Sequence, residues 1–161
     1  MDLRKAICKK LKEENGLSYD ADEEIIITVG AAEAILDTVL AFVNEGDEVI
    51  VFTPTFMNYE NLVHIAGAKA VTVPLLEKNW FQIDPDAVRA VITNKTRMII
   101  VNNPHNPTGK VFNKEILKEV AEIAMENNLL VLSDEIYEQI IYYGAKLLLD
   151  GCFWRHEGTH D

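Results

Sequence analysis

The sequence predicts an α/β protein with a doubly wound, mostly parallel sheet and helices on both faces. Short apolar runs rich in Val and Ile alternate with longer segments whose apolar residues recur at helical spacing. Strands and helices that alternate in this way are typical of a parallel sheet covered on both sides. The 161 residues, 48% hydrophobic and 25% charged, suffice for one domain with a packed core.

The chain opens with a helix and a strand. Apolar residues recur at helical spacing over residues 3–11, and Asn15-Gly16 ends that helix. The β-branched run at residues 24–29 predicts a buried strand. Gly30 interrupts this run, so a turn is expected there before the next helix.

The alternation continues to residue 133. Residues 31–43 predict a helix with Ile35, Val39 and Phe42 on one face. Asp84-Pro85 places an N-cap and a first-turn proline at the start of a short helix. Further strands are expected at 48–52, 70–73, 97–101 and 129–133, and further helices at 55–66, 85–91 and 114–127.

Charge and composition exclude several classes of partner. The formal net charge is -11 and the pI is about 4.8, so the surface repels phosphate backbones and anionic lipid. No apolar run approaches the roughly 20 residues of a membrane span. The N-terminus has no apolar core typical of a signal peptide. A cytoplasmic protein with reduced Cys8 and Cys152 is therefore expected.

Three segments of unusual composition directly follow predicted strands. They are Val29-Gly30-Ala31-Ala32, the turn-rich residues 102–109, and residues 133–137, which include Asp134. In an open parallel sheet, ligands bind beyond the carboxyl ends of the strands, so these segments are expected along one edge. The first would offer helix N-terminal amides to a phosphate. The alternatives are a plain βα turn for the first segment, an ordinary loop rich in Pro and Gly for the second, and an N-cap or a paired carboxylate for Asp134 in the third.

The second and third segments carry a family resemblance. Residues 103–109 read Asn-Pro-His-Asn-Pro-Thr-Gly, and residues 133–137 read Ser-Asp-Glu-Ile-Tyr. At this separation they resemble the class I/II aminotransferases of pyridoxal phosphate (PLP) fold type I, and the resemblance covers roughly residues 3–146. It implies a partial PLP-binding large domain at 1–146 and a tail of different character at 147–161. A cis Asn106-Pro107 bond is also expected.

The resemblance implies a role for each cofactor-binding residue. Asp134 would pair with the protonated pyridine nitrogen, and Asn106 and Tyr137 would hydrogen-bond the phenolic oxygen of PLP. Phe56 would stack on the ring, the alternative being a core position in an amphipathic helix. The cofactor-binding set is Gly30, Ala31, Ala32, Phe56, Asn106, Asp134 and Tyr137. Tyr59 lies nearby in sequence and receives no role.

The catalytic lysine of the family is not expected in this chain. That residue follows the Asp-x-x-Tyr motif at a distance, whereas Lys146 follows it closely and resembles a solvated turn residue. The parent reaction implied is amino transfer between an L-amino acid and a 2-oxo acid, with the chain alone inactive. A frameshift or an early stop would explain the tail.

Three alternatives stay open. One is a non-catalytic PLP-binding or dimerisation fragment, because in the family two later strands separate the first and last strands of this chain. Without them the first strand has no partner and an apolar edge is open, which predicts a homodimer, self-association or poor solubility. A nucleotide-binding α/β protein is disfavoured, since neither G-x-G-x-x-G nor G-x-x-x-x-G-K-[ST] is present. A metal site formed by Cys152, His156 and His160 is the third.

Overall fold

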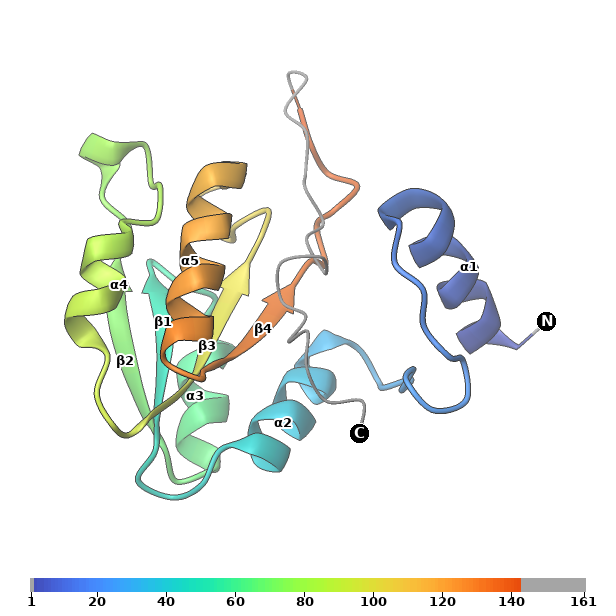
Figure 1. Cartoon of the computed structure of the whole chain (residues 1–161), viewed down its shortest axis with the longest axis horizontal. Helices are drawn as coiled ribbons and strands as arrows, with labels where there is room; N and C mark the ends of the chain where they lie inside the picture. The colour runs from blue at the N-terminus through green and yellow to red at the C-terminus, as the bar shows by residue number, and fades with distance from the viewer. Residues whose placement is uncertain (1, 143–161) are drawn as a thin grey trace.

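The computed structural model describes residues 2–142 of the chain, and Figure 1 shows its elements in order. They are α1 (Leu3–Asn15), α2 (Ala31–Phe42), β1 (Glu48–Thr53), α3 (Asn58–Ile65), β2 (Lys69–Pro74), the short 3-10 helix η1 (Glu77–Asn79), α4 (Pro85–Val91), β3 (Thr96–Asn102), α5 (Lys114–Glu126) and β4 (Leu130–Asp134). Helices and strands alternate from α2 onward, as the hydrophobic pattern predicts.

The strands form one parallel sheet in the order β2-β1-β3-β4. Every strand connection in it crosses over through a helix, which parallel pairing requires. The predicted parallel α/β class is therefore confirmed. The register pairs Val101 with Ser133 and Asn102 with Asp134, so β3 and β4 end side by side.

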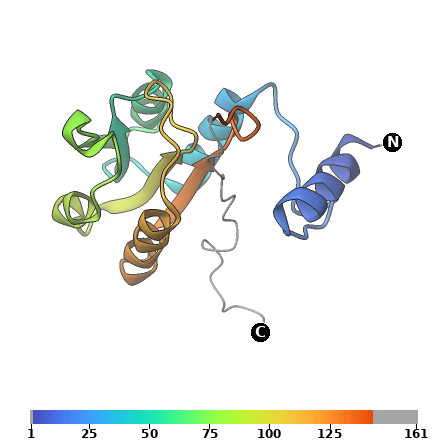
Figure 2. The ribbon, with the colours of Figure 1, turned by 90° about the horizontal axis from the view of Figure 1, so that it is seen from above.

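Helices cover both faces of the sheet because alternate side chains of each strand point to opposite sides. On β1, Ile50 and Phe52 join a core that includes residues of α4 and α5. Val49 and Val51, the alternate residues, join a second core with residues of α2 and α3. Figure 2 shows these two helix pairs on opposite sides of the sheet.

The predicted strand at residues 24–29 is wrong. These residues form no strand in the structure, and the side chains of Ile26 and Val29 are 85% and 90% exposed. A strand forms only where a neighbouring strand can pair with its N–H and C=O groups. Residues 24–29 pair with no strand, and within the described residues the outer edge of β4 is also unpaired. Phe42 also differs from expectation, since it is 56% exposed while Ile35 and Val39 are buried.

The helix α1 lies beside the segment that follows β4, away from the helices that cover the sheet (Figures 1 and 2). It ends at Gly16, whose φ of 71° is the left-handed value that glycine adopts without strain. None of its residues is buried. Lys10 of α1 forms an ion pair with Glu138, so the helix is tied to that segment through polar contacts.

Several predictions fall outside the described part of the chain. These concern the domain boundary between residues 146 and 147, the solvated Lys146, and the metal alternative at Cys152, His156 and His160. Within residues 2–142, no cluster of three or more His, Cys, Asp or Glu side chains is arranged to hold a metal ion. No helix in the same range combines the length and apolar character needed to cross a membrane.

Candidate functional site

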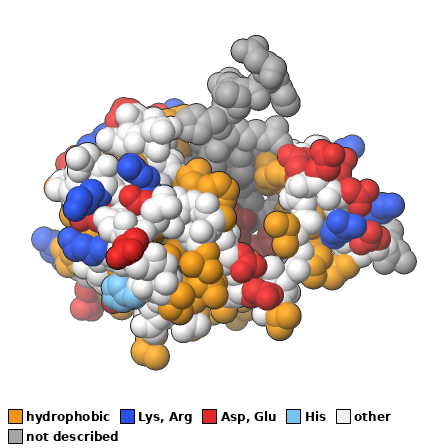
Figure 3. Space-filling view, turned by 90° about the horizontal axis from the view of Figure 1, so that it is seen from below, with side chains coloured by type: hydrophobic (Ala, Val, Ile, Leu, Met, Phe, Trp, Pro, Cys, Tyr) orange, Lys and Arg blue, Asp and Glu red, His pale blue; other side chains and the backbone are white. Residues whose placement is uncertain are grey.

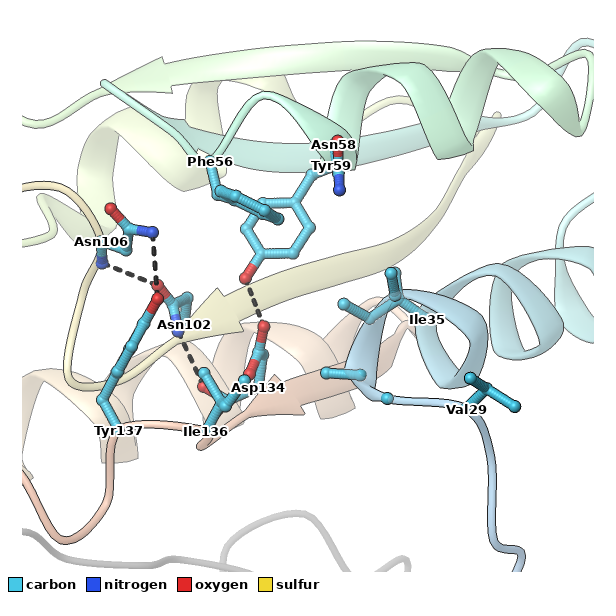
Figure 4. Close-up of a pocket in the computed structure, with 13 residues that line it drawn as sticks. Val29, Ile35, Phe56, Asn58, Tyr59, Asn102, Asn106, Asp134, Ile136 and Tyr137 are labelled. Carbon is cyan, nitrogen blue, oxygen red and sulfur yellow. Dashed lines mark hydrogen bonds between the residues drawn. The ribbon is translucent and has the colours of Figure 1, made fainter.

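A pocket of about 220 Å³ opens beyond the carboxyl ends of β3 and β4, beside the N-terminus of α2 (Figure 4). This is the edge at which ligands bind in open parallel sheets. The volume suits a small aromatic ligand and is below the ~300–1,000 Å³ usual for drug-sized molecules. All the predicted cofactor-binding residues line it, namely Gly30, Ala31, Ala32, Phe56, Asn106, Asp134 and Tyr137.

The N-terminus of α2 forms one wall of the pocket. Gly30 precedes the helix with a φ of 83°, a left-handed value that favours glycine, and no side-chain hydrogen bond caps the helix. The amides of Ala31 and Ala32 belong to the first turn, where backbone N–H groups lack intrahelical acceptors. These amides and the helix dipole make this wall suited to an anion.

The loop after β3 brings Asn106 to the pocket. The Asn102 side chain accepts a hydrogen bond from the Asn106 backbone N–H at 2.7 Å and donates one to the Asp134 carbonyl oxygen at 3.0 Å. The Asn106 side-chain amide donates to the Tyr137 hydroxyl at 3.2 Å. The loop contains cis bonds before Pro104 and Pro107, and the second confirms the sequence prediction.

The carboxylate of Asp134 points into the pocket from the end of β4 (Figure 4). Its Oδ2 accepts a hydrogen bond from the Tyr59 hydroxyl at 2.6 Å, and its Oδ1 accepts one from the Ile136 backbone N–H at 3.2 Å. Burial, followed by the hydrogen bond and charge of Asp134, raises the pKa of Tyr59 above its usual range. The phenol therefore stays protonated and acts as the donor.

Phe56 lies before α3 and lines the pocket. Its ring is 40% exposed, so the alternative of a core position is wrong. The ring makes an edge-to-face contact with Tyr59, with centroids 6.0 Å apart and planes at 76°. The ring is therefore partly accessible in the pocket that it lines.

His105 supports the same loop from its buried side. Its imidazole is 4% exposed and packs against Phe112 at a centroid distance of 5.7 Å. Nδ1 lies 2.8 Å from the Thr108 hydroxyl. Burial lowers the pKa of His105 to about 4, so the ring is neutral near pH 7.

Two residues that contribute to the site were missed from the sequence. Tyr59 follows Phe56 by three residues, so the helix predicted at 55–66 would place both aromatic rings on one side, and the sequence contains this signal. Asn102 ends β3 directly before the turn-rich loop, but its contacts to Asn106 and Asp134 depend on the strand register. A lysine is absent from the pocket lining in the described residues.

Comparisons with known proteins agree with the geometry. The family model described as aminotransferase class I and II matches residues 1–154. An aspartate aminotransferase of Pyrococcus abyssi is 43% identical over 158 residues, covering 96% of this chain and 41% of the relative. An aromatic-amino-acid aminotransferase of Thermococcus litoralis is 41% identical over 159 residues, with the same coverages.

Solved structures give the same result. The aromatic aminotransferase of Pyrococcus horikoshii has a TM-score of 0.89 at 42% identity, covering 92% of this chain and 41% of its own. The N-succinyldiaminopimelate aminotransferase of Mycobacterium tuberculosis also scores 0.89 at 42% identity, with coverages of 92% and 40%. The chain therefore spans about 41% of the length of the curated relatives named above.

Proposed function

Because the chain belongs to the class I and II aminotransferase family, we propose that its pocket is the PLP site of an enzyme that transfers an amino group between an L-amino acid and a 2-oxo acid. One observation carries the proposal. The carboxylate of Asp134, the amide of Asn106, the phenol of Tyr137 and the ring of Phe56 face one pocket beside a helix N-terminus.

The donor set fits the chemical groups of PLP. The α2 amides at Ala31 and Ala32 suit the phosphate, and the Asp134 carboxylate suits a protonated pyridine nitrogen. Asn106 and Tyr137 are hydrogen-bonded to each other at 3.2 Å, which brings an amide and a hydroxyl together for the phenolic oxygen. Phe56 offers an exposed ring to the face of the pyridine.

Each residue would contribute binding, orientation or proton placement. When bound, PLP supplies an electron sink for negative charge at the substrate α-carbon. Asp134, held by two donors, would keep a proton on the ring nitrogen. Asn106 and Tyr137 would hold the opposite edge of the ring through its phenolic oxygen, and Phe56 would shield one face from water.

The 161-residue chain itself would bind PLP without covalent attachment and would not catalyse transfer. This follows from the pocket lining, which in the described residues contains no lysine able to form a Schiff base. Amino transfer is therefore proposed for the whole protein to which these residues belong. A cytoplasmic location is proposed with it, because Cys8, which lies in the described part of the chain, is a free thiol, as suits a reducing compartment.

Binding of PLP to the 161-residue chain tests the proposal. We expect saturable binding, followed by absorbance and by quenching of intrinsic fluorescence, and about tenfold weaker binding for Asp134→Ala because a charged hydrogen-bond partner is removed. Asp86→Ala, an exposed acid on α4, is the matched control and should leave affinity unchanged. Absence of saturable binding would refute the proposal.

Two further results would redirect the interpretation. Borohydride reduction of the complex, followed by peptide mapping, should label no single pocket lysine. A unique labelled lysine would overturn the non-covalent part of the proposal. Tight binding of a dinucleotide in place of PLP would favour a nucleotide-binding α/β protein.

A second proposal concerns self-association as a dimer or larger species. Apolar side chains gather on the face seen in Figure 3, over the body of the domain and over the part that contains α1. Ile26, Val29 and Ile136 are each more than half exposed, and the outer edge of β4 is unpaired within the described residues. Unpaired edges and exposed apolar groups favour contact with a second chain.

A further inference from the structure

We propose that Tyr59 is a positioning residue that holds the Asp134 carboxylate toward the ring nitrogen of the cofactor. The proposal rests on the PLP site proposed above. Tyr59 reaches Asp134 from a different element, since it lies on α3 whereas Asp134 ends β4. The distance between the two oxygens is 2.6 Å, within the range of short hydrogen bonds to an ionised acceptor.

The position of the Tyr59 hydroxyl is fixed by the core. The side chain is 4% exposed and belongs to the apolar cluster between α2, α3 and the sheet. Its ring also contacts Phe56 edge to face. A buried ring of this kind has little rotational freedom, so its hydroxyl is a rigid donor and not a mobile surface contact.

The contact restricts the carboxylate at both oxygens. The Ile136 backbone N–H binds Oδ1 at 3.2 Å and the Tyr59 hydroxyl binds Oδ2 at 2.6 Å. Each carboxylate oxygen can accept a second hydrogen bond, so one further donor can still approach from the pocket. Without the Tyr59 phenol, the Asp134 carboxylate would keep only the longer hydrogen bond from the Ile136 backbone N–H. The half-buried Asp134 side chain could then turn away from the pocket.

The Tyr59 phenol also has the charge state that a donor to the Asp134 carboxylate needs. Burial and the neighbouring carboxylate raise its pKa, so it does not become an anion that would repel Asp134 near neutral pH. A neutral donor leaves the negative charge of Asp134 available for a cationic ring nitrogen. Tyr59 therefore orders the carboxylate without neutralising it.

This role predicts coupling between the Tyr59 hydroxyl and one atom of the ligand. The test compares PLP with an analogue in which the pyridine nitrogen is replaced by a C–H group. Equilibrium dissociation constants are measured by fluorescence quenching for the wild-type 161-residue chain, Tyr59→Phe and Tyr137→Phe. Tyr137→Phe is the matched control, because it removes a phenol that contacts Asn106 on the other side of the pocket.

We expect Tyr59→Phe to weaken PLP binding about tenfold and to change binding of the carbon analogue less than about twofold. Tyr137→Phe should weaken both ligands by a similar factor. Equal losses for both ligands in Tyr59→Phe would show a merely structural role and overturn the inference, as would unchanged PLP affinity. Urea unfolding of Tyr59→Phe verifies that the packing of the ring is retained.

The same measurements separate this inference from the proposed function. Suppose the wild-type chain binds PLP more tightly than the carbon analogue, but Tyr59→Phe weakens the binding of both ligands equally. The proposed PLP site would then stand, and the proposed role of Tyr59 would be refuted. Wild-type chain that binds neither ligand would refute the PLP site and the role of Tyr59 together.

Discussion

Lowering the pH from 7 toward 4 should reduce the stability of this protein through the imidazole of His105. The ring is 4% exposed and its pKa is lowered to about 4 by burial, whereas an unfolded histidine titrates near 6.5. Between these values the unfolded chain binds a proton that the folded chain does not. The contribution to folding is therefore complete above pH 6.5 and is lost as the pH falls through 4.

The size of the effect follows from the shift. A difference of about 2.5 pH units at about 1.36 kcal/mol per unit gives a ceiling of about 3 kcal/mol, and partial screening by solvent reduces it to roughly 2 kcal/mol. Protonation would also remove the acceptor that Nδ1 offers to the Thr108 hydroxyl when that hydroxyl donates. Acid should thus loosen the loop that carries Asn106 before the rest of the sheet.

Urea unfolding at pH 7.5 and pH 4.5 measures this contribution. Carboxylates also titrate between these pH values and change the stability of both proteins. The contribution of His105 is therefore the drop in unfolding free energy from pH 7.5 to pH 4.5 in the wild type minus the same drop in His105→Gln. We expect a difference of roughly 2 kcal/mol. His64→Gln, an exposed position on α3, should behave like the wild type. Equal losses in the wild type and His105→Gln would refute the reasoning.

Three other predictions concern packing and association. Ile99→Ala, at a fully buried position, should lower the free energy of unfolding by about 2–5 kcal/mol, whereas Ile26→Ala at an 85% exposed position should change it by less than about 0.5 kcal/mol in urea titrations. Lys10→Ala removes the half-buried ion pair with Glu138 and should lower the free energy of unfolding by about 1 kcal/mol. Lys9→Ala removes an exposed ion pair and should lower it by only a few tenths of a kcal/mol, and thermal unfolding of the two variants tests the difference. Sedimentation should show self-association that Ile26→Lys with Val29→Lys reduces, and a compact wild-type monomer at high concentration would contradict this.

Most of the fold could be predicted because its elements are determined by local patterns. The predicted helix at 85–91 matches α4 (Pro85–Val91), since the Asp84 side chain caps it and Pro85 occupies the first turn. The strand predicted at 97–101 lies within β3 for a similar reason, a short β-branched run. Residues 24–29 carry the same kind of run, yet a strand also requires a partner, and partners are not encoded locally.

The site could be predicted to the extent that it follows strand ends and a family resemblance. Asn106 follows β3 and Asp134 ends β4, and both line the pocket, whereas Gly30 follows residues that form no strand and lines the pocket as the residue before α2. Tyr59 could not be assigned in this way, because its hydroxyl meets Asp134 across 75 positions of sequence. Contacts of this length depend on how α3 packs on the sheet, and a single sequence shows only that α3 has an apolar face.

Strand register explains why short motifs so far apart can form one site. Parallel pairing places Asn102 opposite Asp134, so the ends of β3 and β4 coincide. Asn102 then joins the two loops with one amide, accepting from the Asn106 N–H and donating to the Asp134 carbonyl. A shift of one residue would send these side chains to the opposite face of the sheet. The register between β3 and β4 therefore also fixes the distance between the groups proposed to hold the two edges of the cofactor ring.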